Sequence, residues 1–323
     1  MRRNWLQEIL LEYGGLISVV MPVFNRAHLV PRIVGSIIAQ SYTNLDIVVV
    51  DDCSTDDIEG AIAALNDPRV RLVRREKNGG AAAARNTGIA AARADWIAFH
   101  DSDDICTFDR IDLSVRHLAT LPGDYIGVYG ARVIYNEVGE ADYARAGGYV
   151  IPRAGEWVLS GDIAARTRVG NIINFPTLLV KKSALLAAGP LDEMLRQNED
   201  WDLCLRLTRQ GRIGFVPEPL ILTPTSLDPD VSAARVSRSA RQGARSFARI
   251  TGKLKRGGFG GPALAAHYTT TALYLLQIDR PRLARRFLHA ALAITPARPR
   301  LWAHLLLSHA PGLHARLRRP GRL

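Results

Sequence analysis

The sequence predicts an α/β fold: a mostly parallel, twisted sheet with flanking helices, followed by a helical C-terminal extension. Short apolar segments rich in β-branched residues alternate with helical patterns about every 25 residues, as in βαβ units. These segments are apolar at nearly every position, which is typical of parallel strands covered by helices on both faces. Polar or acidic stretches follow three of them, and ligands of such sheets bind beyond the carboxyl ends of the strands.

The elements of the main domain, predicted at residues 16–227, follow a regular order. Strands are expected at 16–21, 47–50, 70–73, 96–99, 125–135 and 213–216, and a strand followed by a helix at 178–189. Helices are expected at 30–40, 57–65, 80–93, 108–121 and 199–210. A polar hairpin is expected at 136–148, and prolines indicate an irregular exit at 217–219 and 224–229.

The C-terminal extension, residues 228–323, is helical in pattern and differs from the main domain in charge. Residues 235–323 carry eighteen Lys or Arg and one acid, a net charge of +17, whereas the first 234 residues carry −6. Four arginines recur at helical spacing and form one basic stripe: Arg238, Arg241, Arg245 and Arg249. Three apolar side chains lie on another side of that helix: Phe247, Ile250 and Leu254. A hinge is expected at 257–262, a helical hairpin at 273–278 and 283–294, and a short helix at 302–307.

Composition excludes several classes of protein. The three cysteines are far apart and show no CxxC spacing, so neither a disulfide framework nor a zinc site is expected, in keeping with a reducing cytosol. The N-terminal lead-in, residues 1–15, contains Glu8 and Glu12 and is not typical of a signal peptide. No uncharged apolar run reaches the roughly 18 residues of a membrane span. We therefore expect a cytoplasmic protein whose basic tail attracts an anionic partner.

An acidic stretch after the strand at 96–99 is the most informative segment. Asp101, Asp103 and Asp104 place three carboxylates within four residues. An unpaired carboxylate is costly to bury, so such a cluster must face water, a cation or both. Carboxylate oxygens suit Mg²⁺ or Mn²⁺, although an acidic turn after a strand is also typical of a solvated loop.

The motifs together resemble glycosyltransferase family 2, whose GT-A fold binds nucleotide-diphospho-sugars. The resemblance covers about residues 16–225 and depends on segments that occur in the family's order: 17–25, 49–56, 78–88, 101–104, 190–193 and 199–203. For the first segments it implies a donor site. Asp52, beside Asp51, would accept the base N–H of a uridine or similar nucleotide, and three residues would frame that base: Pro22, Phe24 and Asn25.

Alternatives remain for the donor residues. Asp51 and Asp52 are also consistent with a turn and a helix cap, and Asp56 is predicted to be the cap. Gly79 precedes a helix whose N-terminus would attract phosphate, although Gly-Gly is also an ordinary turn. Arg85 would contact the diphosphate or hold the scaffold, with an ion pair to Asp101 or Asp104 as the alternative.

The resemblance also implies the catalytic groups. Asp103 would bind the metal, and Asp101 would lie beside the ribose or the ion. Asp200 would be the base that removes the acceptor hydroxyl proton in an inverting transfer, with Glu199 and Asp202 as competitors. Glu199 and Trp201 would lie on the acceptor side, although acidic residues in a first helical turn also complement the helix dipole and Trp201 is also consistent with the core.

Three positions depart from the family pattern. Cys53 stands where glycine is common, and His100 stands where an apolar residue is common. Residues 223–226 lack the basic or aromatic side chains that many members carry after the last strand.

The expected function is an inverting, metal-dependent transfer of a hexosyl or N-acetylhexosaminyl group. The donor would be a nucleotide-diphospho-sugar, UDP-linked, and the acceptor a hydroxyl of a glycan or lipid-linked molecule in cell envelope polysaccharide biosynthesis. Mn²⁺ or Mg²⁺ would be the cofactor, and the basic tail would hold the protein on the inner face of the cell membrane. No nucleic acid partner is expected, because the tail has few aromatic residues to stack bases. The alternative is a nucleotide-sugar-binding protein or a nucleotidyltransferase-like enzyme without glycosyl transfer.

Overall fold

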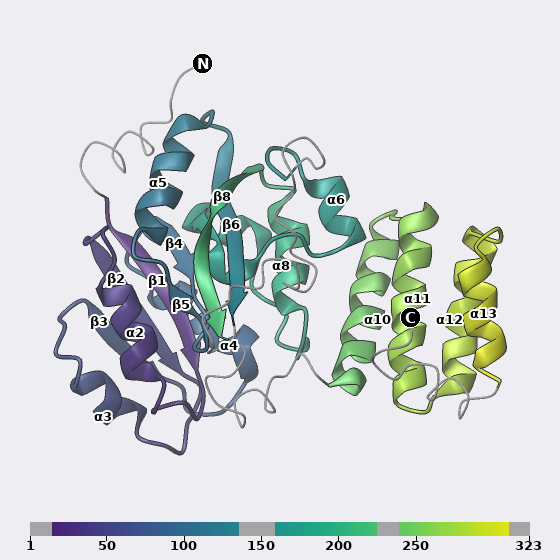
Figure 1. The fold of residues 1–323 in the computed structure, drawn as a ribbon, viewed down its shortest axis with the longest axis horizontal. Helices are drawn as coiled ribbons and strands as arrows, with labels where there is room; N and C mark the ends of the chain where they lie inside the picture. Colours follow the sequence, from purple (N-terminus) through teal and green to yellow (C-terminus); the bar gives the residue numbers. More distant parts are fainter. Residues whose placement is uncertain (1–14, 136–158, 225–238, 310–323) are drawn as a thin grey trace. The chain divides into compact units, whose positions relative to one another are not determined.

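The computed structural model describes residues 15–135, 159–224 and 239–309. The chain divides into two compact units (Figure 1). Unit 1 comprises Met1–Thr167, Asn171–Glu193 and Asp200–Ser232, and unit 2 comprises Arg168–Gly170, Met194–Glu199 and Ala233–Leu323. The predicted boundary between residues 227 and 228, the hairpin at 136–148 and nearly all of the lead-in lie outside the described residues, so those predictions remain open.

Unit 1 is built on an eight-stranded sheet with the order β3-β2-β1-β4-β7-β6-β8-β5. The strands are β1 (Ile17–Val23), β2 (Leu45–Asp51), β3 (Val70–Arg74), β4 (Trp96–Phe99), β5 (Ile105–Cys106), β6 (Tyr125–Tyr135), β7 (Leu179–Lys181) and β8 (Arg212–Pro224). The first four strands in this order are parallel, β7 is antiparallel to β4 and β6, β8 is parallel to β6, and β5 is antiparallel to β8. The predicted mostly parallel sheet is confirmed, and the antiparallel pairings among these strands all involve β7 or β5.

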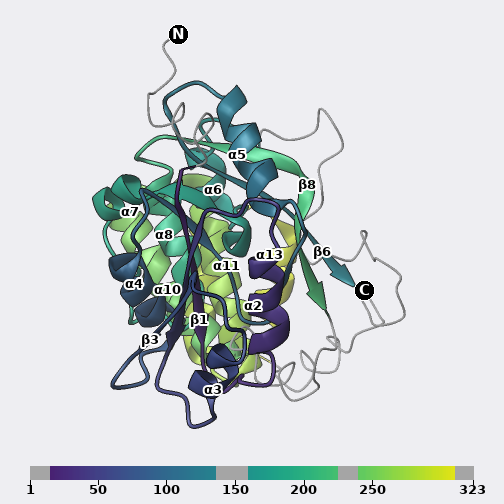
Figure 2. The same cartoon turned by 90° about the vertical axis from the view of Figure 1, so that its left-hand side faces the viewer.

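Helices cover both faces of the sheet, as the continuous apolar strands require. They are α2 (Val30–Ile38), α3 (Ile58–Ala63), α4 (Gly80–Ala91), α5 (Arg110–Thr120), α6 (Ala164–Val169), α7 (Lys182–Ala188) and α8 (Glu199–Leu207). Along β1, Val19 and Met21 join the core formed with α2 and α5, whereas Val20 points to the core formed with α4, α7 and α8. Figure 2 shows β1 between these two groups of helices.

Strand β8 differs from the prediction, because it does not end at its prolines. Gly130 of β6 pairs with Val216 and Ala131 pairs with Pro219, so Pro217 and Glu218 form a bulge and pairing then continues to Pro224. A bulge removes residues from the hydrogen-bonded ladder, which is where a strand tolerates proline. The expected irregular exit at 217–219 is therefore wrong.

Three short elements were not predicted: β5, α6 and the 3₁₀ helix Phe175–Thr177. Each is too short to show a periodic pattern, and β5 exists because Ile105 and Cys106 pair with Leu222 and Ile221 of β8. The helix at 57–65 is shorter than expected, Ile58–Ala63, and begins after the cap Asp57.

Unit 2 contains four helices among its described residues: α10 (Ala240–Arg256), α11 (Gly261–Gln277), α12 (Pro281–Ile294) and α13 (Pro299–Leu307). The predicted hinge separates α10 from α11, and the predicted hairpin break at residues 279–281 separates α11 from α12. Arg241, Arg245 and Arg249 are exposed on α10, while Ile250 and Leu254 are buried, as expected; Arg238 lies outside the described residues. Within the described part of the chain, no helix combines the length and apolar character needed to span a membrane.

Candidate active site

Side chains in the loops that follow β1 and β2 hold the two loops together. Asn25 has a positive φ of 50°; its backbone N–H donates to Ser54 Oγ at 2.9 Å, and its Oδ1 accepts from Thr55 N at 2.8 Å. Ala27 N donates to Asp56 Oδ2 at 2.6 Å. Phe24, in the same loop, keeps 44% of its surface exposed, so its ring is available to a ligand at the carboxyl end of β1.

Asp52 is buried, and its carboxylate already has several partners. Its oxygens accept from Gly79 N at 3.0 Å and Gly80 N at 2.6 Å, and the guanidinium of Arg75 forms an ion pair with it. The carboxylate therefore caps the N-terminus of α4, the position that the sequence indicated for phosphate. Gly80 has φ 82°, a conformation that glycine adopts without strain.

The neighbouring acidic residues have distinct structural roles. Asp51 is buried; its Oδ1 accepts from Ser54 N at 2.8 Å, and its Oδ2 lies 3.5 Å from Arg74 Nε. The N-cap of α3 is Asp57, which accepts from Gly60 N at 2.8 Å, so the prediction that Asp56 is the cap is wrong. Asp56 instead binds the β1 loop through Ala27, because it lies one residue too early to reach the helix N–H groups.

Cys53, the first departure from the family pattern, lies in this turn with φ 66°. The left-handed region is strained for a residue with a Cβ, which explains why glycine is common there. Its thiol contacts Glu76 O at 3.6 Å.

The acidic cluster comprises Asp101, Asp103 and Asp104, in the loop after β4. One carboxylate oxygen from each lies within 4.8 Å of the others. Arg85 Nη2 donates to Asp101 Oδ1 at 2.7 Å, which is the ion pair expected as the alternative for this arginine. Arg26 approaches from the β1 loop, with Nη1 2.7 Å from Ser102 Oγ and 3.7 Å from Asp103 Oδ1.

The carboxyl groups of the acidic cluster differ in their electrostatics. Burial raises the pKa of Asp101, but the Arg85 guanidinium outweighs this and holds the pKa below its usual value. Burial, together with the charges of Asp103 and Asp101, raises the pKa of Asp104 to about 7. Asp104 Oδ1 accepts a hydrogen bond from Thr223 Oγ1 at 2.6 Å, so strand β8 holds this carboxyl group in place.

The donor set of the acidic cluster fits a divalent ion. All three residues offer carboxylate oxygen, which Mg²⁺ and Mn²⁺ prefer, and one oxygen from each lies close to the other two. Asp101 and Asp103 are only partly buried, so both remain accessible to an ion and a ligand.

A buried polar group lies beneath the acidic cluster and explains His100, the second departure. Arg110 Nη1 lies 2.9 Å from His100 Nδ1, and its Nη2 donates to Phe99 O at 2.5 Å and Pro176 O at 2.7 Å. The other ring nitrogen, His100 Nε2, lies 3.1 Å from Asp104 O. The group therefore connects β4, α5 and the 3₁₀ helix to the backbone of the acidic cluster.

Asp200 lies in the first turn of α8. Asn171 Nδ2 donates to its Oδ2 at 3.2 Å, and Trp201 N donates to its Oδ1 at 2.7 Å. The charges of Asp200 and Arg85 both act on the buried thiol of Cys204, whose pKa is raised mainly by burial. Arg85 also pairs with Asp101, so the charge of this one guanidinium acts on both the acidic cluster and α8.

The other residues of this turn separate into two kinds. Trp201 keeps only 2% of its surface exposed and donates its indole N–H to Thr167 O at 2.7 Å, so it belongs to the core and offers no face for sugar stacking. Asp202 is buried and pairs with Arg206 at 3.0 Å, which removes it as a competitor for the role of base. Glu199 is partly exposed at the start of α8.

Sequence reasoning missed Arg26, Arg75, Asn171 and Thr223 as parts of this arrangement. Arg26 directly follows the framing residues of the β1 loop, so its position gave a signal. The pairing of Thr223 with Asp104 spans 119 residues and left no trace in the local pattern.

Comparison with known proteins finds similarity to a family model over part of the chain. Residues 18–160 match the family model described as glycosyl transferase family 2. The UDP-Glc:alpha-D-GlcNAc-diphosphoundecaprenol beta-1,3-glucosyltransferase WfgD of Escherichia coli is 33% identical over 121 residues, which cover 38% of this chain and 47% of WfgD. The chain spans less than half the length of two curated relatives that it matches in Escherichia coli.

Solved structures share the fold at low sequence identity. S. aureus TarS 1-349 in complex with UDP-GlcNAc has a TM-score of 0.61 and 17% identity, covering 91% of this chain and 87% of that one. The mannosyltransferase PcManGT from Pyrobaculum calidifontis, in complex with GDP-Man and Mn²⁺, has a TM-score of 0.58 and 18% identity, covering 96% and 86%. The likeness to both structures extends to the fold alone.

Proposed function

We propose that the chain is a member of glycosyltransferase family 2 and transfers a sugar from a UDP-linked donor to a hydroxyl of a glycan or lipid-linked acceptor. The observation that carries the proposal is the acidic cluster at the end of β4, which is flanked by Arg26 and Arg85. The UDP-GlcNAc complex of TarS and the name of WfgD support the choice of donor. A hexosyl or N-acetylhexosaminyl group is the transferred unit.

Asp101 and Asp103 are the proposed ligands of Mn²⁺ or Mg²⁺, with Asp104 behind them. When bound, the ion supplies Lewis-acid neutralisation of the departing nucleoside diphosphate. The Mn²⁺ complex of PcManGT supports this choice of cofactor. Arg85 keeps Asp101 ionised, and Thr223 fixes the Asp104 carboxyl, so the residues hold the acidic cluster ready for the ion.

Asp200 is the proposed base. Its carboxylate takes the proton of the acceptor hydroxyl while that oxygen forms a bond to the anomeric carbon and the bond to the diphosphate oxygen breaks. Attack from the opposite face inverts the configuration, so an α-linked donor yields a β-linked product. The hydrogen bonds from Asn171 and Trp201 orient the carboxylate before the acceptor arrives.

The donor base lies, in this proposal, against the β1 loop. Phe24 offers an exposed ring, while Pro22 and Asn25 form the adjoining backbone. Asp51, Asp52 and Gly79 shape the floor rather than contact the base directly, because their polar atoms bind Ser54, Arg75 and the start of α4. Glu199 is proposed to face the acceptor.

The acceptor is proposed to be an intermediate of cell envelope polysaccharide at the inner face of the membrane. The name of WfgD, whose acceptor is attached to diphosphoundecaprenol, supports this choice.

A donor screen tests the proposal. Purified full-length protein is incubated with Mn²⁺ and a panel of nucleotide-sugars, and slow release of nucleoside diphosphate without acceptor identifies the donor. Asp200→Asn should then lower turnover with acceptor by about 10²–10⁴-fold, the usual contribution of a general base, with donor affinity unchanged. An inactive Glu199→Gln variant together with an active Asp200→Asn variant would show that Glu199, rather than Asp200, is the base. If a nucleotide-sugar binds but none of the donors is hydrolysed, the result would favour a nucleotide-sugar-binding protein.

A further inference from the structure

Helix α13 of unit 2 is apolar on two sides. Leu301 and Leu305 are buried and pack into the core of the unit, as one face of an amphipathic helix should. The side chains on its other side are also largely apolar, yet they are exposed: Pro299, Trp302, Ala303 and Leu306. Trp302 keeps 49% and Leu306 70% of its surface exposed, and the two are four residues apart on one face. Such a helix presents a second apolar surface, here called the α13 face.

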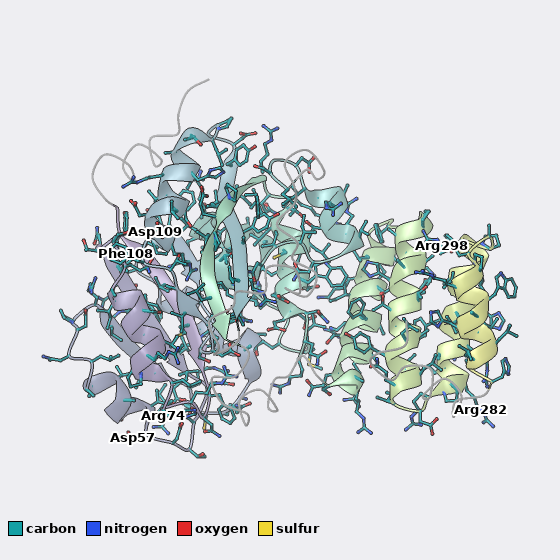
Figure 3. All side chains as sticks on the ribbon, viewed as in Figure 1. Asp57, Arg74, Phe108, Asp109, Arg282 and Arg298 are labelled. Carbon is teal, nitrogen blue, oxygen red and sulfur yellow. The ribbon has the colours of Figure 1, made fainter. Side chains whose placement is uncertain are left out.

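Arginines flank the α13 face at both ends. Arg298 is the N-cap of α13, and Arg300 lies in its first turn. Arg285 Nη1 donates to Ser308 O at 3.0 Å, which brings the first turns of α12, with Arg282 and Arg286, to the end of α13. Figure 3 shows Arg298 and Arg282 at opposite ends of the α12–α13 pair. Residues 239–309 contain twelve Lys or Arg and one acidic residue, Asp279.

We propose that the α13 face docks on an anionic lipid surface, with Trp302 and Leu306 inserted among the headgroups and the flanking arginines on the phosphates. An apolar strip within a basic surface matches both layers of such a bilayer, and tryptophan is favoured at the boundary between them. Nucleic acid would leave Leu306 without a partner, and a second copy would oppose one basic surface with another. The proposal rests on the proposed function, since an enzyme that uses a lipid-linked acceptor must meet the membrane.

The basic stripe of α10 offers a contrasting surface. Arg241 and Arg245 are exposed, but the neighbouring apolar side chains of that helix, Ile250 and Leu254, are buried. This stripe has charge without an apolar component, so it can attract anionic lipid but cannot insert. Its removal should lower the rate and salt sensitivity of binding, whereas changes in the α13 face should lower the depth of insertion.

Vesicle binding without donor or acceptor tests the proposal. Full-length protein is sedimented with phosphatidylcholine vesicles, with and without phosphatidylglycerol, at rising NaCl. We expect binding only with phosphatidylglycerol, weakened by salt. Trp302→Ser with Leu306→Ser should lower the partition coefficient about tenfold or more, since burial of one leucine contributes about that factor. Phe108→Ser is the matched control, because Phe108 is 70% exposed in unit 1 (Figure 3) and should leave binding unchanged.

Brominated lipid gives a second readout that does not depend on the polar variant folding. The fluorescence difference between wild type and Trp302→Phe isolates Trp302, and brominated phosphatidylglycerol should quench it. Vesicle binding without quenching would show that another surface docks and overturn the proposal. Binding to neutral vesicles alone, tighter binding to nucleic acid, or a dimer that dissociates on Leu306→Ser would each overturn it too. Nucleoside diphosphate release from the donor, measured without vesicles, tests the proposed function separately.

Discussion

Replacing Asp52 by asparagine tests whether this carboxylate holds unit 1 together or is kept for a ligand. The carboxylate accepts from Gly79 N and Gly80 N and pairs with Arg75, and it is 3% exposed. Asparagine keeps one acceptor oxygen but turns an amide N–H toward one of these donors. It also removes the negative charge that faces the N-terminus of α4.

The loss can be calculated from these contacts. A charge-assisted hydrogen bond contributes about 1.5–3 kcal/mol, and an anion at a helix N-terminus about 0.3–1 kcal/mol. The unfolding free energy of unit 1 should therefore fall by about 2–4 kcal/mol. With a urea slope of about 3 kcal/mol per M, the unfolding midpoint should fall by about 1 M.

Urea unfolding followed by circular dichroism measures this shift, and UDP calorimetry measures the ligand. Asp57→Asn is the matched control: Asp57 is exposed, caps α3 through Gly60 N, and asparagine caps a helix equally well (Figure 3). That variant should change the unfolding free energy by less than about 0.5 kcal/mol. Equal urea midpoints for wild type and Asp52→Asn, together with a loss of UDP affinity, would refute the reasoning and show that the carboxylate binds the uracil base.

Three further predictions concern other parts of unit 1. Arg26→Ala should raise the affinity for Mn²⁺ in the absence of nucleotide by about tenfold, because the substitution removes a cation near Asp103. A Mn²⁺ titration followed by electron paramagnetic resonance measures the affinity, and an unchanged or lower affinity would contradict the prediction. Cys53→Gly should raise the unfolding free energy by about 0.5–1 kcal/mol, since relief of left-handed strain, about 1–2 kcal/mol, exceeds the entropic cost of glycine in the unfolded chain; a lower urea midpoint would count against this. Burial raises the pKa of Asp46, but hydrogen bonds from Arg71 and Ser18 outweigh burial and lower the pKa in the folded state. This carboxylate therefore stabilises unit 1 at pH values above its unfolded pKa of about 3.9. The stabilisation is lost as the pH falls toward the folded pKa. The difference in urea midpoint between wild type and Asp46→Asn should accordingly be larger at pH 7 than at pH 3, and an equal difference at both would exclude the ion pair as its cause.

The sequence predicted those elements whose signal is local. Strands β1, β2 and β4 are almost entirely buried and largely apolar, so their positions and the class of the sheet followed from hydrophobic pattern. The break between α11 and α12 followed from the proline at position 281. Strand β8 was cut short because the proline rule holds only for residues in the ladder, and the bulge at Pro217 is created by pairing with β6.

The candidate site was predictable in its acidic residues but not in their partners. A carboxylate cluster after a strand is visible in the chain, and so is the acidic start of α8. Which cations and hydroxyls meet those carboxylates depends on contacts between distant segments, such as Arg26 with Ser102 and Thr223 with Asp104. The cap at Asp57 rather than Asp56 was missed for a different reason, since a shift of one residue lies within the uncertainty of any helix boundary.

The charges around the acidic cluster indicate how it would respond to a donor. Asp101 is paired with Arg85, and Asp103 lies near Arg26, so two carboxylates already have cations beside them. The divalent ion proposed at Asp103 would therefore have to displace or repel the Arg26 guanidinium, and this repulsion would weaken binding of the ion in the absence of a nucleotide. A nucleoside diphosphate brings negative charge that both the ion and Arg26 attract, so ion and donor should each strengthen the binding of the other by the same factor. In the proposed site the arginine would thus couple the two ligands, and the ion would arrive together with the donor rather than ahead of it.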